Sequence, residues 1–272
     1  MNTTVLQVWT GEDQPAYVQR SLCRVQRYSE LQGYEYIRHS QRQLRLSYSA
    51  AWERIPQLIG MLGAAEWKHN RSRVVVYLDA DLQVLDYERP VRELFQGCGR
   101  AELITTTDFN ADFFPGWGSC CLGQCECAIN TGVLIARVWP RSSSWAKSIF
   151  QEMLQSPLCK PFHRTRQWDQ DCLQLLLNRG GHMPSHGKLL HAKRSLEPAV
   201  GPSKKICVLP QLLVAPALPF VDNAHPLYSY RGSKALRNAL LPLDRWNASM
   251  PPPFSAHAFL LCNANVHRGC TK

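Results

Sequence analysis

The stretch Arg73-Val74-Val75-Val76-Tyr77-Leu78-Asp79-Ala80-Asp81-Leu82 decides the fold of this 272-residue chain. Its apolar run, rich in β-branched residues, is typical of a strand buried on both faces of a parallel or mixed α/β sheet. Two acidic residues follow directly, and side chains two positions apart on an extended segment point the same way. We therefore expect Asp79 and Asp81 to converge just beyond the carboxyl end of this strand, where α/β sheets bind their ligands.

Two converging carboxylates have a definite chemistry. They form a hard-oxygen site that suits Mn²⁺ or Mg²⁺, and such ions commonly take further ligands from the phosphates of a substrate. The alternative is a buried strand that ends in an ordinary polar turn, because Asp-x-Asp is a short pattern. Both interpretations predict the strand, and only the first predicts a function for Asp79 and Asp81.

The segments around this strand alternate between strand and helix patterns. Strands are expected at residues 5–9, 34–38, 102–106 and 127–138, and helices at 14–32, 50–67, 90–95, 142–155 and 168–178. This order predicts an α/β fold with a mostly parallel, Rossmann-like central sheet flanked by helices.

The second half of the chain gives weaker signals. Residues 108–127 have no hydrophobic period and are expected to form a long loop, which in a compact domain is usually functional or mobile. Short strands are expected at 206–209 and 259–261 and a helix at 233–240, separated by proline-rich connections. We expect one domain over residues 1–272 with a less regular C-terminal part.

Composition restricts the class of partner. The chain is 45% hydrophobic and 19% charged, which is ordinary globular composition. Its net charge of +10 favours an anionic partner, such as nucleic acid, anionic lipid, a nucleotide diphosphate or an acidic glycan. Because no recognised nucleic-acid module and no interleaving of basic with aromatic residues is found, we expect no nucleic-acid partner.

The cellular compartment follows less directly from the sequence. No apolar run approaches 18 residues, so we expect a soluble protein or a catalytic domain without its membrane anchor. Eleven cysteines leave open disulfides in a secretory compartment and reduced thiols in the cytosol. Glycosylation sequons at Asn2, Asn70 and Asn247 favour the lumen slightly. We expect the Golgi or endoplasmic reticulum lumen if an anchor has been lost, and the cytoplasm otherwise.

Three further polar segments are candidates for a site. They are Asn130-Thr131-Gly132-Val133-Leu134, Trp168-Asp169-Gln170-Asp171 and His267-Arg268-Gly269-Cys270. Gly132 leaves room beside a strand for a ligand or for a neighbouring backbone. The acidic residues around Gln170 also fit ordinary helix caps, and His267 also fits an exposed terminal residue.

Taken in order, these segments resemble the GT-A nucleotide-sugar glycosyltransferases. The resemblance is greatest to family 34, whose α-galactosyl-, α-xylosyl- and α-mannosyltransferases retain the anomeric configuration. Tyr28-Ser29-Glu30-Leu31-Gln32-Gly33-Tyr34 is similar to the family's Tyr-Ala-x-x-His-Gly-Tyr segment. Trp52-Glu53-Arg54-Ile55-Pro56 is similar to its Trp-x-Lys-Ile/Pro helix start. The resemblance covers about residues 5–177, with a shorter match at the C-terminus.

The resemblance implies roles for the candidate metal ligands. Asp81 would ligate Mn²⁺, and Asp79 would help to hold the metal and the ribose. A C-terminal histidine completes the metal site in the family, and His267 is the candidate. The family reads His-x-x-Gly-Cys where this chain has His267-Arg268-Gly269-Cys270, so His257 or water stays open as the third ligand.

The resemblance also implies where the reaction takes place. Asp169 and Gln170 would lie near the anomeric carbon and the acceptor, with Asn130 as a further catalytic residue and Gly132 beside the donor. The donor would occupy about residues 1–107, and residues 108–272 would carry the acceptor site and the catalytic residues.

The expected function is therefore a metal-dependent, retaining transfer. A sugar moves from a nucleotide-diphosphate sugar to a hydroxyl of a glycan or glycoconjugate. Two alternatives remain. The first is a glycogenin-like family 8 transferase, whose late His-x-x-Gly-x-x-Lys loosely fits the ending at Lys272. The second is a non-catalytic module that binds a nucleotide sugar, because a fold does not fix a function.

Overall fold

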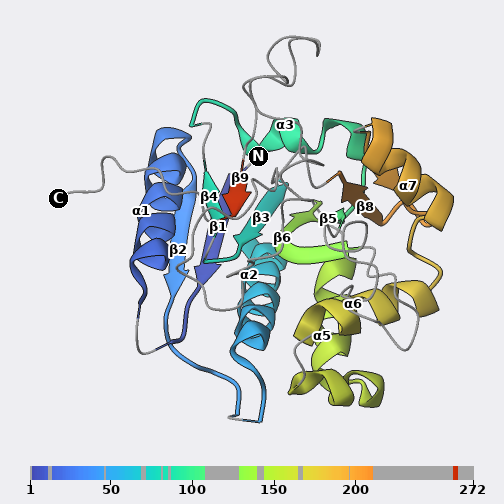
Figure 1. Cartoon of the computed structure of the whole chain (residues 1–272), viewed down its shortest axis with the longest axis horizontal. Helices are drawn as coiled ribbons and strands as arrows, with labels where there is room; N and C mark the ends of the chain where they lie inside the picture. Colours follow the sequence, from blue (N-terminus) through green and yellow to red (C-terminus); the bar gives the residue numbers. More distant parts are fainter. Residues whose placement is uncertain are drawn as a thin grey trace, which may run out of the picture.

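A computed structural model describes residues 2–11, 14–45, 47–68, 72–80, 82–84, 87–107, 129–139, 144–164, 168–195, 197–210 and 260–262. Their centre is a seven-stranded sheet with the order β2-β1-β3-β6-β5-β8-β7 (Figure 1). Its strands are β1 (Asn2–Val8), β2 (Glu35–His39), β3 (Arg73–Leu78), β5 (Leu103–Thr107), β6 (Ile129–Val138), β7 (Ala199–Val200) and β8 (Ile206–Leu209). The α/β architecture predicted from the sequence is thereby confirmed.

The helices lie around this sheet (Figure 1). The α-helices are α1 (Ala16–Leu31), α2 (Arg54–Lys68), α3 (Val91–Leu94), α5 (Trp145–Gln155), α6 (Trp168–Arg179) and α7 (His186–Ser195). Short 3-10 helices are η1 (Ala50–Glu53), η2 (Gln96–Cys98) and η3 (Pro157–His163). The helix expected at residues 50–67 is thus a 3-10 turn that continues into α2, while α7 and η3 were not predicted.

Strand direction is more mixed than the sequence indicates. Strands β1, β2, β3, β5 and β8 run one way, whereas β6 is antiparallel to β3 and β5, and β7 is antiparallel to β8. A parallel connection needs a long crossover, usually a helix. Residues 108–127, between β5 and β6, have no helical period, which agrees with an antiparallel return.

The sheet has a hydrophobic core on each face. Val75 and Tyr77 of β3 belong to one core with residues of α2, α5 and α6. Val74, Val76 and Leu78 belong to the other core with residues of α1 and α3. Because both faces of β3 are covered, its sequence is continuously apolar instead of alternating. Full burial of one such aliphatic side chain contributes about 1.5–3 kcal/mol.

Two disulfides link described elements. Cys98 of η2 is bonded to Cys207 of β8, and Cys159 of η3 is bonded to Cys172 of α6. The sequence separations are 109 and 13 residues, so one disulfide closes a long loop and the other a short one. The sequence alone gave no basis for pairing these cysteines.

A small second sheet places residues 260–262 beside the short strand that follows β3. Strand β4 (Leu82–Val84) pairs antiparallel with β9 (Leu260–Cys262), and Leu82 is opposite Cys262. The strand expected at 259–261 is therefore found with a shift of one residue. The loop expected at 108–127 and the helix expected at 233–240 lie outside the described residues. No helix in the described part of the chain is long and apolar enough to cross a bilayer.

Candidate active site

A cavity of about 260 Å³ opens where β1 and β3 end. Its walls come from the end of β1 and the loop after it, which includes Trp9, from the end of β3, and from the start of η1 and α2. Arg54, Tyr77 and Asp79 line it together. Because β1 and β3 are parallel neighbours, the cavity occupies the position at which α/β sheets bind ligands.

Arg54 is the centre of the polar network in this cavity. Its Nε and Nη2 donate to the two carboxylate oxygens of Asp169 at 2.7 and 2.6 Å, which is a bidentate pair. Its Nη1 donates to Asp79 Oδ1 at 2.6 Å. One guanidinium therefore joins the residue that follows β3 to the first turn of α6.

Further contacts fix the guanidinium in place. Arg54 Nη1 donates to the carbonyl oxygen of Thr131 at 3.1 Å, and Nη2 donates to the Thr131 hydroxyl at 3.0 Å. The hydroxyl of Tyr77 donates to Asp79 Oδ1 at 2.6 Å. Tyr77 precedes Asp79 by two residues, so both side chains leave the chain on the same side.

The two carboxylates of the network differ in exposure. The side chain of Asp79 is 37% exposed and that of Asp169 is fully buried. Burial raises the pKa of Asp169, and the charge of Arg54 works against that rise. Burial would lower the pKa of Arg54, but Asp169, Tyr77 and Asp79 outweigh it, so its pKa lies well above the ordinary value. With one cation between two carboxylates, the network has an excess negative charge, and Asp79 is its exposed member.

Asn130 and Gly132 of β6 adjoin Asp79. The amide of Gly132 donates to Asn130 Oδ1 at 2.8 Å, and the amide of Asp79 donates to the carbonyl oxygen of Gly132 at 2.8 Å. A Cβ at Gly132 would lie 2.9 Å from both Asn130 Oδ1 and Asp79 Oδ2. Only glycine fits between these two side chains without a shift.

Gln170 joins the same group from α6. Its Oε1 accepts a hydrogen bond from the amide of Thr131 at 3.2 Å. The structure thus brings Asp79, Asn130, Gly132, Asp169 and Gln170 together at one edge of the sheet. Asp79 lines the cavity, whereas Asp169 lies behind Arg54 with no exposed surface. Asp81, His267 and His257 lie outside the described residues.

Arg54, Tyr77 and Thr131 belong to this network but were not among the predicted site residues. An arginine at the start of a strongly apolar helix was the available signal for Arg54, because a buried cation must be paired. For Tyr77 the signal was a hydroxyl two residues before Asp79 on a strand. Neither signal indicates which residue Arg54 or Tyr77 contacts.

A larger hollow of about 830 Å³ lies at the opposite, amino-terminal ends of β1 and β3. Its charged residues include Arg73 and Glu35, which pair with each other at 2.9 Å. It contains none of the predicted site residues, and ligands of α/β sheets bind at the other edge. We therefore assign the candidate active site to the smaller cavity.

Gly132→Ala is expected to lower the free energy of unfolding by about 1–3 kcal/mol, the usual cost of overpacking. Asp79 Oδ1 is held by Arg54 and Tyr77, so its side chain cannot easily yield to the new methyl group. Urea denaturation measures the effect. Gly60→Ala is the matched control, because Gly60 lies in α2 with nothing within 4 Å of its Cβ position. An equal stability for the two variants contradicts the close approach at Gly132.

The chain is similar in fold to solved glycosyltransferases. One is a glycosyltransferase involved in the glycosylation of the major capsid of PBCV-1, with 12% identity, a TM-score of 0.53, and coverage of 98% of this chain and 95% of that chain. Another is mouse xyloside xylosyltransferase 1 in its apo form, with 10% identity, a TM-score of 0.46, and coverage of 97% and 98%. No protein-family model and no curated protein sequence matches the chain. At 12% identity the first likeness establishes the fold alone.

Proposed function

We propose that the chain is a glycosyltransferase that binds a nucleotide-diphosphate sugar in the cavity at the ends of β1 and β3. The sugar would pass to a hydroxyl of a glycan or glycoconjugate. The observation that carries the proposal is the Arg54-centred network, which holds Asp79 at the rim of this cavity and Asp169 behind it. The likeness of the fold to a solved glycosyltransferase supports this proposal.

The cavity offers groups that suit the nucleoside end of a donor. Trp9 lines it, and its indole atoms lie 3.1 Å from the Cβ position of Gly11. An aromatic ring provides a surface on which a nucleobase can stack. The partly exposed Asp79 carboxylate can accept hydrogen bonds from the ribose hydroxyls. We assign the base to the Trp9 side of the cavity and the diphosphate to the Asp79 side.

Asp79 and Asp81 would hold a divalent cation, Mn²⁺ or Mg²⁺. Arg54 and Tyr77 both use Asp79 Oδ1, while Oδ2 accepts no hydrogen bond from the described residues and is free for a metal. Carboxylate oxygens are the ligands that these ions favour. No group of three potential ligands occurs within the described ranges, and Asp81 and His267 lie beyond them. The ion would neutralise the charge that develops on the departing diphosphate.

The burial of Asp169 bears on the stereochemistry. A carboxylate that is fully buried and bonded to Arg54 through both oxygens cannot attack an anomeric carbon in the cavity. Asp169 is therefore excluded as the nucleophile of a double displacement. The retaining transfer that the family resemblance implies would then take place on one face of the sugar, with the departing phosphate accepting the proton of the acceptor hydroxyl. Arg54, Asp169, Asn130 and Gln170 would then act through position and electrostatics.

We also propose that the protein works in the lumen of the endoplasmic reticulum or Golgi. The disulfides Cys98–Cys207 and Cys159–Cys172 support this, because such bonds persist in oxidising compartments. The three sequons point in the same direction.

A screen of the purified chain against nucleotide sugars tests the function. Release of UDP or GDP is measured with Mn²⁺, with Mg²⁺ and with a chelator. Metal-dependent release from at least one donor, lost in Asp79→Asn, is the expected result. Donor binding without turnover for every acceptor offered would identify a non-catalytic module, and neither binding nor turnover would exclude the proposal. Analysis of the product anomer then tests the retaining mechanism.

A further inference from the structure

We propose that the Cys159–Cys172 disulfide is a positioning element for the Arg54–Asp169 pair, so that the candidate site depends on the oxidation of these two cysteines. The part of this proposal that concerns activity rests on the proposed function. The part that concerns the ion pair does not, and it has its own test.

The first step links the disulfide to Asp169. Cys172 follows Asp169 by three residues in α6, so the two side chains lie on the same side of the helix. Asp169, Cys172 and Cys159 are all fully buried. A covalent bond at Cys172 therefore restricts the rotation and the sliding of the helical turn that presents the Asp169 carboxylate.

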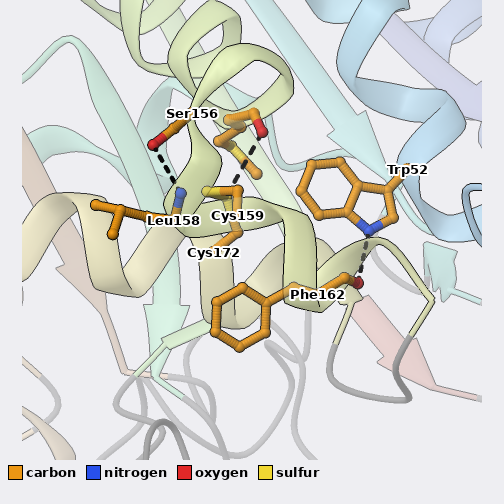
Figure 2. Close-up of a disulfide and its surroundings, with 7 residues drawn as sticks. Trp52, Ser156, Leu158, Cys159, Phe162 and Cys172 are labelled. Atoms are coloured by element: carbon orange, nitrogen blue, oxygen red, sulfur yellow. Dashed lines mark hydrogen bonds between the residues drawn. A yellow bond between two sulfur atoms is a disulfide. The ribbon is translucent and has the colours of Figure 1, made fainter.

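The second step links the disulfide to the segment before Arg54. Cys159 lies in η3. The last residues of η3 accept hydrogen bonds from Ser49 and Trp52, which lie just before η1 and within it. Trp52 Nε1 donates to the carbonyl oxygen of Phe162 at 3.2 Å, and the amide of Ser49 donates to the carbonyl oxygen of His163 at 2.7 Å. Figure 2 shows the Cys159–Cys172 disulfide and the hydrogen bond from Trp52 to Phe162, which both reach residues of η3.

Ring packing strengthens this second link. The His163 ring stacks on Tyr48 with centroids 4.1 Å apart, and it makes a T-shaped contact with Trp52 with centroids 4.7 Å apart. Trp52 is itself fully buried. The connection between η3 and Trp52 is therefore made by packed aromatic rings as well as by a hydrogen bond.

The two steps close a ring of contacts. From Cys172 the ring runs through Cys159 and η3 to Trp52, then two residues along the chain to Arg54, and back through the ion pair to Asp169. The disulfide is the covalent cross-link in this ring. Without it, the direct covalent link between Cys159 and Cys172 is lost, and η3 stays joined to α6 through the chain of residues 164–167.

A bidentate ion pair needs such a restraint. Its hydrogen bonds of 2.6 and 2.7 Å require the guanidinium and the carboxylate to be coplanar and in register. A misplacement of about 1 Å at a catalytic group can lower the rate by about 100-fold. Reduction opens the disulfide to two thiols as a dithiol reductant is oxidised to its own disulfide, and it releases this restraint.

The other disulfide supplies a matched control. Cys98–Cys207 links η2 to β8 within the core on the α1 and α3 side of the sheet. Cys98–Cys207 closes a loop of 109 residues, whereas Cys159–Cys172 closes one of 13 residues. Removal of Cys98–Cys207 is therefore expected to lower the stability at least as much as removal of Cys159–Cys172. Cys98–Cys207 belongs to no part of the ring. A purely structural role for both disulfides predicts that their removal affects stability alone.

The decisive experiment is a double-mutant cycle on the folding equilibrium, measured in urea. Asp169→Asn is expected to lower the folding constant by about 100-fold in the native chain and by less than 10-fold when Cys159→Ala and Cys172→Ala are also present, because the pair is then already loosened. With Cys98→Ala and Cys207→Ala the 100-fold loss should remain. Equal losses in all three backgrounds overturn the proposal.

A second measurement covers a failure of the Cys159→Ala, Cys172→Ala chain to fold. Hydrogen exchange is followed in the native protein after graded reduction, with mass spectrometry to assign the reduced disulfide. Molecules reduced at Cys159–Cys172 should exchange the amides of residues 169–172 at least 10-fold faster, while the amides of α5 stay protected. Unchanged exchange at residues 169–172 overturns the proposal.

The activity arm uses kcat and KM. Loss of Cys159–Cys172 is expected to lower kcat about 10-fold, with no further loss on adding Asp169→Asn, while loss of Cys98–Cys207 changes kcat less than twofold below the melting temperature. Additive losses contradict positioning. If the native chain transfers no sugar from any donor, the proposed function fails, and the folding cycle still decides the positioning proposal.

Discussion

Arg54→Met is expected to lower the free energy of unfolding by about 3–5 kcal/mol, the cost of breaking a buried ion pair by removing one partner. The variant leaves the carboxylate of Asp169 fully buried without its cation. The loss of Arg54 costs less free energy at Asp79, because the Asp79 side chain is 37% exposed and water can solvate its charge. Urea denaturation at neutral pH gives the difference directly.

The loss should depend on pH with a definite sign. Burial raises the pKa of Asp169, and without Arg54 nothing of comparable strength opposes that rise. The folded variant then binds a proton more tightly than the unfolded chain, in which an aspartate has a pKa of about 3.9. Its stability relative to the native protein should therefore be greatest at and below about pH 4 and fall as the pH rises towards the elevated pKa.

Two variants serve as controls for Arg54→Met. Arg73→Met removes an arginine from a pair with Glu35 in which the glutamate is 57% exposed, so it should cost less than about 1 kcal/mol. Arg54→Met combined with Asp169→Asn buries no charge and should be more stable than Arg54→Met alone. If Arg54→Met lowers the free energy of unfolding no more than Arg73→Met does, the buried ion pair contributes no more stability than the exposed one.

The sequence predicted those parts of the fold that depend on local patterns. The continuous apolar run at Val74–Leu78 specified a strand covered on both faces, and the helical period of residues 145–155 specified α5. The serine that caps α5 is Ser144, the last of three serines in a row, and the helix begins at Trp145, so the expected start at residue 142 was early by three residues. Local patterns fix an element more firmly than its ends.

The unpredicted parts depend on contacts that no local pattern encodes. The antiparallel direction of β6 is a property of its pairing with β3 and β5, which its own apolar sequence does not specify. Helix α7 was missed because Leu189, Leu190 and Ala192 are the only apolar side chains among its ten residues, so its hydrophobic period is weak. Both features follow from tertiary packing.

The sequence predicted which residues lie together in the site, but it did not predict the hydrogen bonds and ion pairs between them. Strand ends and a helix start brought Asp79, Asn130 and Asp169 to one edge of the sheet. Arg54 contacts Asp169 across 115 residues of sequence, and nothing near either residue indicates the other. The same contact changes the expectation for Asp169, because its carboxylate is occupied by Arg54 behind the cavity.

Asp81→Asn is expected to weaken metal-dependent binding of UDP or GDP by about 100-fold or more, since even residues behind a metal ligand contribute 10–100-fold to affinity. Asp81 lies between Ala80, which lines the cavity, and Leu82, which begins β4. Its carboxylate would share the cation with Asp79 Oδ2. Calorimetry with and without Mn²⁺ measures the loss.

This substitution should cost little stability, in contrast to Arg54→Met. The described hydrogen bonds of Arg54 to Asp79, Thr131 and Asp169 involve no atom that Asp81→Asn replaces. Glu93→Gln is the matched control, because it removes one negative charge from a 42% exposed side chain in the Arg89 pair, next to the other hollow. If long-range charge alone governed binding, the two variants would behave alike. Undiminished affinity of the folded Asp81→Asn protein in the presence of Mn²⁺ would remove the cation from the proposed donor site.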